Sequence, residues 1–333
     1  MSAPCTYQLP EHWTAPQVFE DVITAGGLEI HRAGLATTAP DGEEVCGSAA
    51  EPSTRATTRA WYELLERVST LDAIASSRAS FVLHDRAGAA IDVVERTVVF
   101  PESPEPEVWR HARSNGVALH TSWEAACEHA MWELVERDRV LRAWYGETRP
   151  LRLDLAPSDR PASTTHEWCA YSFPAGAGPL ADEVEVVGIF GFPTDDTSPF
   201  VVGYAGRADL RAALASARRE ATQLLAFLWG EPILDEPPAS APTAMFHLEA
   251  YQARGRHRLV REWLEGGHDR FWRGPRPDVV GQRILGFVDL TPPWLTGRLH
   301  VAKAIAGAAV PLVFGPSPAG EHLPRALAFH PIP

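Results

Sequence analysis

The chain has 333 residues, 45% of them hydrophobic, and a formal net charge of −13. This composition allows one large domain or two smaller ones. The acidic balance excludes a basic surface for nucleic acid or for an anionic membrane. The N-terminus lacks the basic and apolar regions of a signal peptide, and no run of about 18 apolar residues predicts a membrane span. Four dispersed cysteines without a CxxC pair are typical of reduced thiols in a cytoplasm.

Helices and strands are expected between proline-rich loops. Apolar periodicity and end signals predict helices over 53–69, 121–144, 209–229 and 254–265. Ser53 or Thr54 is the expected cap of the first helix, and Thr121 or Ser122 begins the second. Strand-like runs lie at 80–85, 91–100, 184–192, 199–206, 283–291 and 299–306. Because strands and helices alternate without a regular βαβ period, the pattern predicts an α+β fold of mixed sheets with packed helices.

Two of these predicted helices contain nearly the same sequence segment, "AWYELLERV" at 60–68 and "AMWELVERD" at 130–138. Residues three apart lie on one helix face, so each helix presents a pair of glutamates beside aromatic residues that predict burial. The pairs are Glu63 with Glu66 and Glu133 with Glu136. One such pair alone is more often a solvated helix face. The repetition favours a shared site and indicates two related halves.

Buried carboxylates must be paired, protonated or bound to a cation. Four glutamates from two helices would form a hard-oxygen site suited to Mg²⁺, which usually shares its ligands with phosphates. Arg67 and Arg137 follow the two pairs and would bind a phosphate oxygen or close a salt bridge. Glu220 and Gln223, in "RREATQLLAF", are uninformative by themselves.

The common catalytic signatures are absent from the sequence. It has no GxxxxGK[ST] or GxGxxG phosphate loop, no GxSxG elbow and no HExxH zinc motif. Cys127 lies at an apolar helix position, which favours a small core residue over a nucleophile.

An ordered set of motifs resembles the YcaO family. The set comprises a small-residue loop before the first ExxER helix, "SNGVALHTSWEAACEHAMWELVERD" at 114–138, E-x-x-Q at Glu220 and Gln223, "FHLEAYQ", "VDLTPPW" and the terminal "AFHPIP". The similarity is to the microcin-type, azoline-forming branch. It covers 45–333, which we expect to form one YcaO-like domain after an N-terminal segment over 1–44.

The resemblance implies ATP-dependent cyclodehydration. A Cys, Ser or Thr side chain of a precursor peptide attacks the preceding carbonyl, ATP phosphorylates the resulting oxygen, and elimination leaves a thiazoline or oxazoline. It implies that the four glutamates hold Mg²⁺ on ATP, and that Arg67, Arg137, Ser114, Asn115, Glu220 and Gln223 contact the nucleotide. Pro331 and Pro333 would form a C-terminal tail that reaches the active site.

The same resemblance leaves three alternatives open. The first loop, Gly47–Ala49, lacks the family's lysine, and Thr121 and Ala125 replace an asparagine and a glutamate of its usual motif. These departures indicate a catalytically silent homologue that binds peptide or acts as a scaffold. A thioamide-forming or an amidine-forming enzyme is equally compatible. We expect a cytoplasmic protein with an E1-like, leader-binding partner, and a thioamide-forming enzyme would need a sulfide-donating partner. The resemblance also allows an azoline dehydrogenase and a homodimer.

Overall fold

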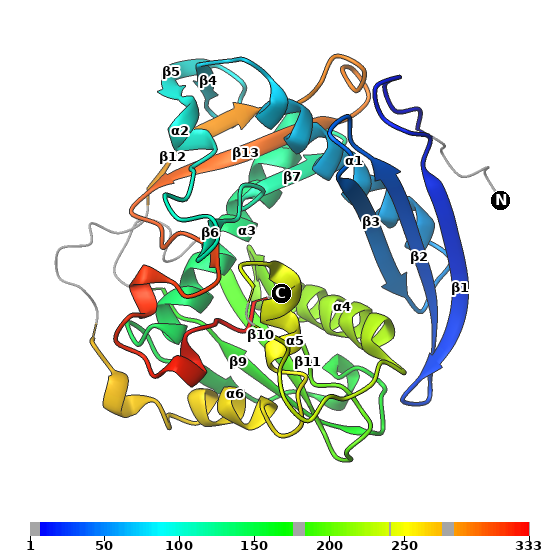
Figure 1. Cartoon of the computed structure of the whole chain (residues 1–333), viewed down its shortest axis with the longest axis vertical. Helices are drawn as coiled ribbons and strands as arrows, with labels where there is room; N and C mark the ends of the chain where they lie inside the picture. The colour runs from blue at the N-terminus through cyan, green and yellow to red at the C-terminus, as the bar shows by residue number, and fades with distance from the viewer. Residues whose placement is uncertain (1–6, 176–183, 240, 275–282, 333) are drawn as a thin grey trace.

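The computed structural model describes residues 7–175, 184–239, 241–274 and 283–332. Within these residues it has six α-helices and four antiparallel sheets (Figure 1). The prediction of an α+β fold with several sheets and packed helices is confirmed, and every described strand pair is antiparallel. No helix in the described part of the chain is long and apolar enough to span a bilayer.

The first sheet is built from β1 (Gln17–Ala25), β2 (Leu28–Thr38) and β3 (Glu44–Glu51). The first ExxER helix, α1 (Ala56–Ala75), packs on β3 and β2. Gly47 of β3 makes this close approach feasible, because a Cβ there would overlap with the backbone of Ala60 and Leu64. The helix is therefore seated directly against the strand, with Leu64, Leu65 and Val68 fully buried.

The second sheet has the order β5-β4-β12-β13-β7. Its strands are β4 (Ser80–His84), β5 (Ala90–Glu95), β7 (Val117–His120), β12 (Arg283–Asp289) and β13 (His300–Gly307). The second ExxER helix, α3 (Trp123–Trp144), packs on β7 and β13 over Ala118, Ala302 and Ala304. Small residues on these strands bring the helix close to the sheet. Alternate residues such as Val301 face the other side, in the core that contains α1.

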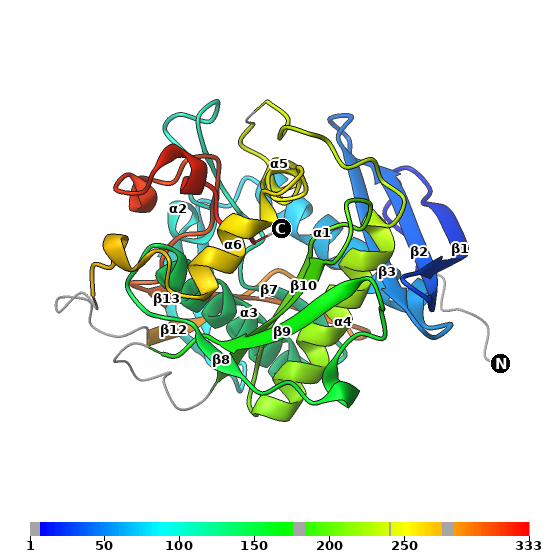
Figure 2. The ribbon, with the colours of Figure 1, turned by 90° about the horizontal axis from the view of Figure 1, so that it is seen from below.

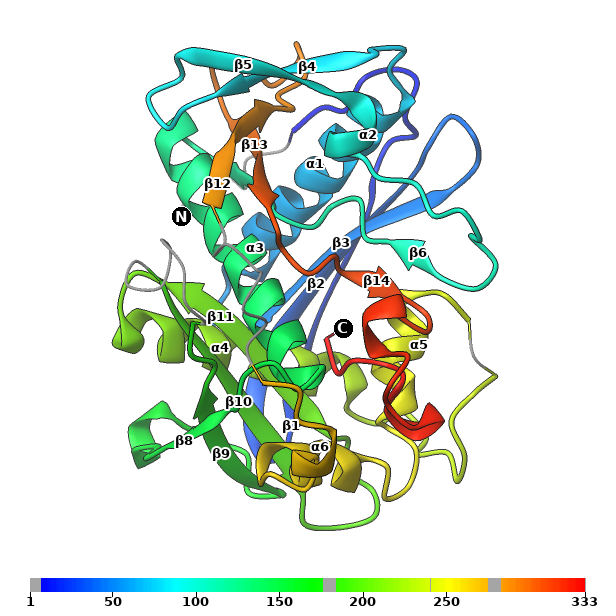
Figure 3. The ribbon, with the colours of Figure 1, turned by 90° about the vertical axis from the view of Figure 1, so that its left-hand side faces the viewer.

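The third sheet has the order β11-β10-β9-β8, from β8 (Leu151–Leu153), β9 (His166–Ser172), β10 (Glu185–Pro193) and β11 (Val201–Arg207). Helix α4 (Leu210–Leu228) covers one face, and α6 (His257–Leu264) crosses the other (Figure 2). Figure 3 shows α3 passing from the second sheet to the third, which it also contacts at β10 and β11. The two sheets thus share one central helix.

Short elements complete the chain. They are α2 (Arg96–Val99), α5 (Ala244–Ala250), the pair β6 (Arg110–His111) and β14 (Val313–Phe314), and 3₁₀ turns at Pro157–Asp159, Asp269–Phe271, Pro318–Gly320 and Arg325–Leu327. The C-terminal end of the described chain lies at the centre of the molecule, near α5 and β10 (Figure 1).

Some local predictions are confirmed and others are wrong. Ser122 caps α3 as expected, accepting a hydrogen bond from the N–H of Ala125 at 3.3 Å. The first helix begins at Ala56 instead, with no side-chain cap, so the Ser53 or Thr54 cap is wrong. The strand expected over 91–100 ends at Glu95, and α2 follows it. The small-residue segment before α1 is strand β3, because β2 pairs with it along its whole length.

Gly203 gives a direct test of how closely α4 approaches the third sheet. A Cβ at this position in β11 would overlap with the carbonyl of Ala217 and the N–H of Ala221. Since backbone atoms cannot move aside as side chains do, we expect Gly203→Ala to lower the free energy of unfolding by about 1–3 kcal/mol. Urea unfolding would measure it. Gly34→Ala in β2 is the control, because the space there is open apart from Phe19 at 3.9 Å.

Candidate functional site

The two glutamates of α1 turn towards neighbouring strands. The N–H of Ser48 in β3 donates to Glu63 Oε2 at 2.8 Å, and Arg67 Nη2 donates to Glu63 Oε1 at 2.5 Å. One turn later, Glu66 Oε2 accepts from the N–H of Leu119 in β7 at 3.0 Å. The close packing of α1 on β3 therefore places both carboxylates at the junction of the first and second sheets.

The glutamates of α3 reach the same junction from the other side. Glu133 Oε1 accepts from the N–H of Gly116 at 3.3 Å, and Glu136 Oε2 accepts from the N–H of Gly206 at 3.0 Å. Gly206 is required at that distance, because a Cβ there would overlap with the carbonyl of Trp132. Each carboxylate is thus fixed by a backbone donor from a different strand or loop.

The four predicted glutamates form one electrostatic unit. Burial raises the pKa of Glu63, Glu66 and Glu136, and raises that of Glu133 to about 7. The negative charges of Glu133 and Glu63 add to the effect on Glu66, whose pKa lies well above its usual range. Mutual repulsion of this kind requires the side chains to be near one another. The ExxER repeat therefore identified residues that the fold brings together.

Positive side chains surround this cluster. Arg137 is half-buried and lies 3.4 Å from Glu136, while Arg59 lies 3.8 Å from Glu220 of α4. Glu220 also adds to the negative charge felt by Glu136 and Glu63, so α4 contributes to the site. Gln223, one turn further along α4, is half-buried.

Two more arginines of the site were not predicted. Arg207 and Arg219 both donate to Ser216 Oγ, at 2.6 and 2.7 Å, although their like charges repel. Burial lowers the pKa of each guanidinium, and Arg207 also lies 5.3 Å from the Trp132 ring. Arg207 comes from the end of β11 and belongs to no motif, so no sequence signal could have found it. Arg59, by contrast, stands four residues before Glu63 on the same helix face.

The loop before β7 carries Ser114 and Asn115. It runs beside Glu133, since Gly116 donates to that carboxylate, and Ser114 itself is exposed. The Asn115 side-chain oxygen is buried without a hydrogen-bond partner in the described structure. An unsatisfied buried acceptor costs about 1–3 kcal/mol, which a bound donor or cation would offset.

These residues fit a magnesium ion bound to a polyphosphate. Among the described residues, no three His, Cys, Asp or Glu side chains stand in a ready-made ligand set, because the glutamates face backbone N–H groups. Desolvated carboxylates nevertheless favour a divalent cation, and clustered guanidiniums favour phosphate. Glu63, Glu66, Glu133 and Glu136 would hold Mg²⁺, which would neutralise phosphate charge, while Arg137, Arg207 and Arg219 would bind phosphate oxygens.

The C-terminal tail is packed close to the same charges. The Tyr204 hydroxyl donates to the carbonyl of Pro331 at 3.3 Å, and Ile332 is fully buried. Both Tyr204 and His330 lie within electrostatic range of Arg137, while Pro333 lies outside the described residues. The described part of the tail is thus held within electrostatic range of the arginine of the second ExxER motif.

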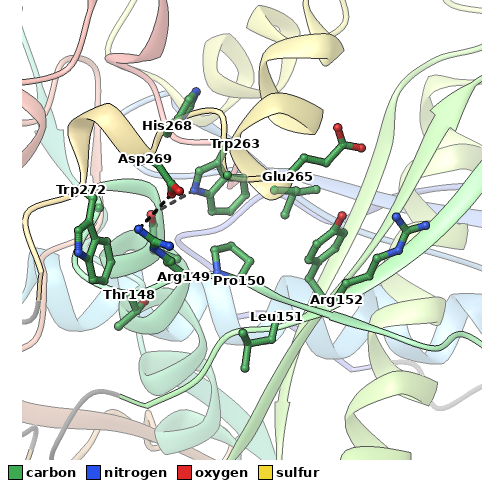
Figure 4. A pocket seen from close by; sticks show the side chains of 15 residues that line it. Thr148, Arg149, Pro150, Leu151, Arg152, Trp263, Glu265, His268, Asp269 and Trp272 are labelled. Carbon is green, nitrogen blue, oxygen red and sulfur yellow. Dashed lines mark hydrogen bonds and ion pairs between the residues drawn. The ribbon is translucent and has the colours of Figure 1, made fainter.

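A separate cavity of about 460 Å³ lies at the other end of α3. Figure 4 shows its wall, with Trp263, Pro150 and Leu151 between the ion pair of Arg149 with Asp269 and the side chains of Arg152 and Glu265. None of the predicted site residues lines it, so it is distinct from the carboxylate cluster. Cys127 is not a site residue either, since it is fully buried in the core and burial raises its pKa to about 12.

The fold is that of known heterocyclases. The structure is similar to a chain of the E. coli microcin synthetase McbBCD complex, with a TM-score of 0.54 and 12% identity over 91% of this chain and 93% of that one. It is also similar to a heterocyclase solved in complex with substrate and cofactor, with a TM-score of 0.53 and 15% identity over 90% of this chain. The chain spans 50% of the length of that heterocyclase. No curated protein matches the sequence.

A protein-family model also matches the sequence. The model of the YcaO cyclodehydratases, described as binding ATP and Mg²⁺, matches residues 93–306, which is more than half of the chain. The protein belongs to the YcaO family. The match includes Glu133 and Glu136, whereas Glu63 and Glu66 precede it.

Proposed function

We propose that this protein uses ATP and Mg²⁺ to convert Cys, Ser or Thr residues of a precursor peptide into thiazolines or oxazolines. Its family is one of cyclodehydratases, and its fold is that of heterocyclases. The observation that carries the proposal is the convergence of four desolvated glutamates from α1 and α3 on one arginine-rich site.

The reaction forms one bond to the amide carbon and removes its oxygen. The peptide nucleophile adds to the preceding carbonyl carbon, the resulting oxygen takes the γ-phosphoryl group of ATP, and phosphate leaves as a C=N bond forms with loss of the amide proton. Arg137, Arg207 and Arg219 would neutralise the charge on the transferred group. Ser114 and Asn115 would contact the nucleotide, with Arg67, Glu220 and Gln223 around it.

The tail suits the peptide-facing side of this site. Pro331 is anchored by Tyr204, and Phe329 by a hydrogen bond from Tyr251 to its carbonyl. This anchoring would hold Pro331 and Pro333 where the substrate amide is deprotonated. Leader recognition would fall to a separate E1-like partner protein. We propose a cytoplasmic setting, where ATP and reduced cysteines are available.

The departures at Gly47–Ala49 favour a second candidate, a catalytically silent peptide-binding subunit. Ser48 uses its backbone N–H on Glu63, and no lysine stands in this strand. A thioamide-forming or amidine-forming enzyme is a third outcome that product mass would reveal.

Mass spectrometry of a reconstituted reaction tests the proposal. The protein, its partner and the precursor peptide with Mg²⁺–ATP should yield a peptide lighter by one water for each ring, and no loss without ATP. A product that has exchanged oxygen for sulfur would identify a thioamide synthase. An unmodified peptide without ATP turnover would favour the silent subunit.

A further inference from the structure

Lys303 is the one lysine of the chain. Of the 30 Lys and Arg residues, 29 are arginines. Lys303 lies on β13, paired with Val117 of β7, and is only 5% exposed. Burial of an ammonium group costs free energy unless its hydrogen-bond donors and its charge are satisfied, so the groups that surround Lys303 must offset this cost.

Both hydrogen bonds of this lysine go to the loop that carries Ser114 and Asn115. Its Nζ donates to the carbonyls of Arg113 at 2.9 Å and of Asn115 at 2.6 Å. The next loop residue, Gly116, donates its N–H to Glu133 at 3.3 Å and accepts from the N–H of Ala304 at 2.9 Å. The loop is thus tied to β13 on one side and to the metal-binding carboxylate on the other.

The lysine also acts on Glu133 through its charge. Burial lowers the pKa of Lys303 to about 8, and the negative charge of Glu133 opposes that effect. In return, the positive charge of Lys303 favours the ionised form of Glu133. The two groups therefore stabilise each other's charged states without a direct ion pair in the structure.

We propose that Lys303 is a positioning residue, which anchors the loop over 113–116 and thereby holds Gly116 against Glu133, so that the loop and this carboxylate face Mg²⁺–ATP as one unit. The inference rests on the proposed function for the identity of the nucleotide. Its geometric part, the anchoring of the loop, stands independently of any ligand.

A lysine suits this position better than the arginines used elsewhere in the chain. Its compact ammonium group directs separate donors to the two carbonyls, and its Nζ lies 6.0 Å from the centre of the Phe100 ring. A guanidinium is a larger planar fork that matches carboxylates and phosphates. Lys303→Arg should therefore restore less than half of the loop protection and nucleotide affinity that Lys303→Met removes.

Hydrogen exchange and nucleotide titration of Lys303→Met test the proposal. We expect amide exchange over 113–117 to accelerate about tenfold or more, and the Kd for Mg²⁺–ATP to rise about 10- to 100-fold, as for lost supporting contacts in metal sites. Val301→Ala is the matched control, because Val301 is fully buried two residues away on the same strand and its apolar side chain makes no hydrogen bond to the loop. It should leave both quantities within about twofold.

The outcomes separate the inference from the proposed function. If wild-type protein binds no Mg²⁺–ATP, the proposed function fails, while exchange over 113–117 still decides the role of Lys303. Exchange and nucleotide affinity equal to those of Val301→Ala would overturn the inference. If Lys303→Met does not fold, the rate of reductive methylation of Lys303 in the wild-type protein is measured instead. We expect Lys303 to be methylated about 100-fold more slowly in the folded protein than in the urea-unfolded chain, and equal rates would overturn the anchoring.

Discussion

We expect the Glu133→Gln variant to lose ring formation. In the absence of metal, the same variant should be more stable to unfolding than the wild type. The amide keeps the shape and an acceptor for Gly116 but removes the charge that would bind Mg²⁺. We expect ATP-dependent ring formation to fall at least about 100-fold. Because the wild-type carboxylate is desolvated beside Glu136, the variant should gain about 1–3 kcal/mol of unfolding free energy at pH 8 without metal.

The pH dependence of that gain follows from the direction of the pKa shift. Burial raises the pKa of Glu133 from 4.5 to about 7, so its contribution to stability is fully present below pH 4.5 and is lost as the pH rises through 7. The advantage of Glu133→Gln should therefore be small at pH 5 and full at pH 8. Denaturant unfolding at the two values measures it. Glu128→Gln on the same helix is the control, and a gain independent of pH would contradict the account.

Removal of the last three residues should stop catalysis while leaving nucleotide binding largely intact. The tail is anchored through Tyr204 and Tyr251, and Ile332 is fully buried, so its end is held near Arg137. We expect the rate of ring formation to fall at least about 100-fold, whereas the Kd for Mg²⁺–ATP should change less than about threefold. Ring formation by mass spectrometry and calorimetry of the nucleotide measure the two quantities.

An extension of the tail by two glycines is the matched control for this truncation. It keeps every residue of the tail and adds two residues that the site would have to accommodate. The extended protein should also lose ring formation while it keeps the thermal stability of the wild type. Full activity of either the truncated or the extended protein would show that the end of the tail has no role in catalysis.

The helices and the glutamate cluster could be predicted from local sequence. Apolar periodicity and repetition of ExxER placed α1 and α3, and Ser122 marked the start of α3, because these signals act over a few residues. The start of α1 was missed, since Arg55 precedes it without a side-chain cap. Tertiary packing against β3 stabilises this end of the helix in place of a capping side chain.

Long-range partners could not be predicted in the same way. Strands β1 and β2 and the strand conformation of Gly47–Ala49 depend on pairing between distant segments. Arg207 and Lys303 enter the site only because β11 and β13 pass beside α3. A single basic residue on a strand carries no spacing that predicts where its side chain will lie. The glutamates of the candidate site could therefore be predicted from the sequence better than its basic residues.

Calorimetric titration of Mg²⁺–ATP into the purified wild-type protein and its Glu133→Gln variant measures directly whether the four glutamates bind a magnesium–nucleotide complex. We expect saturable binding by the wild type that requires Mg²⁺, and binding weakened at least about tenfold in the variant. Binding of equal strength in both proteins, or no binding by the wild type in the presence of its partner, would contradict a magnesium–nucleotide site between α1 and α3.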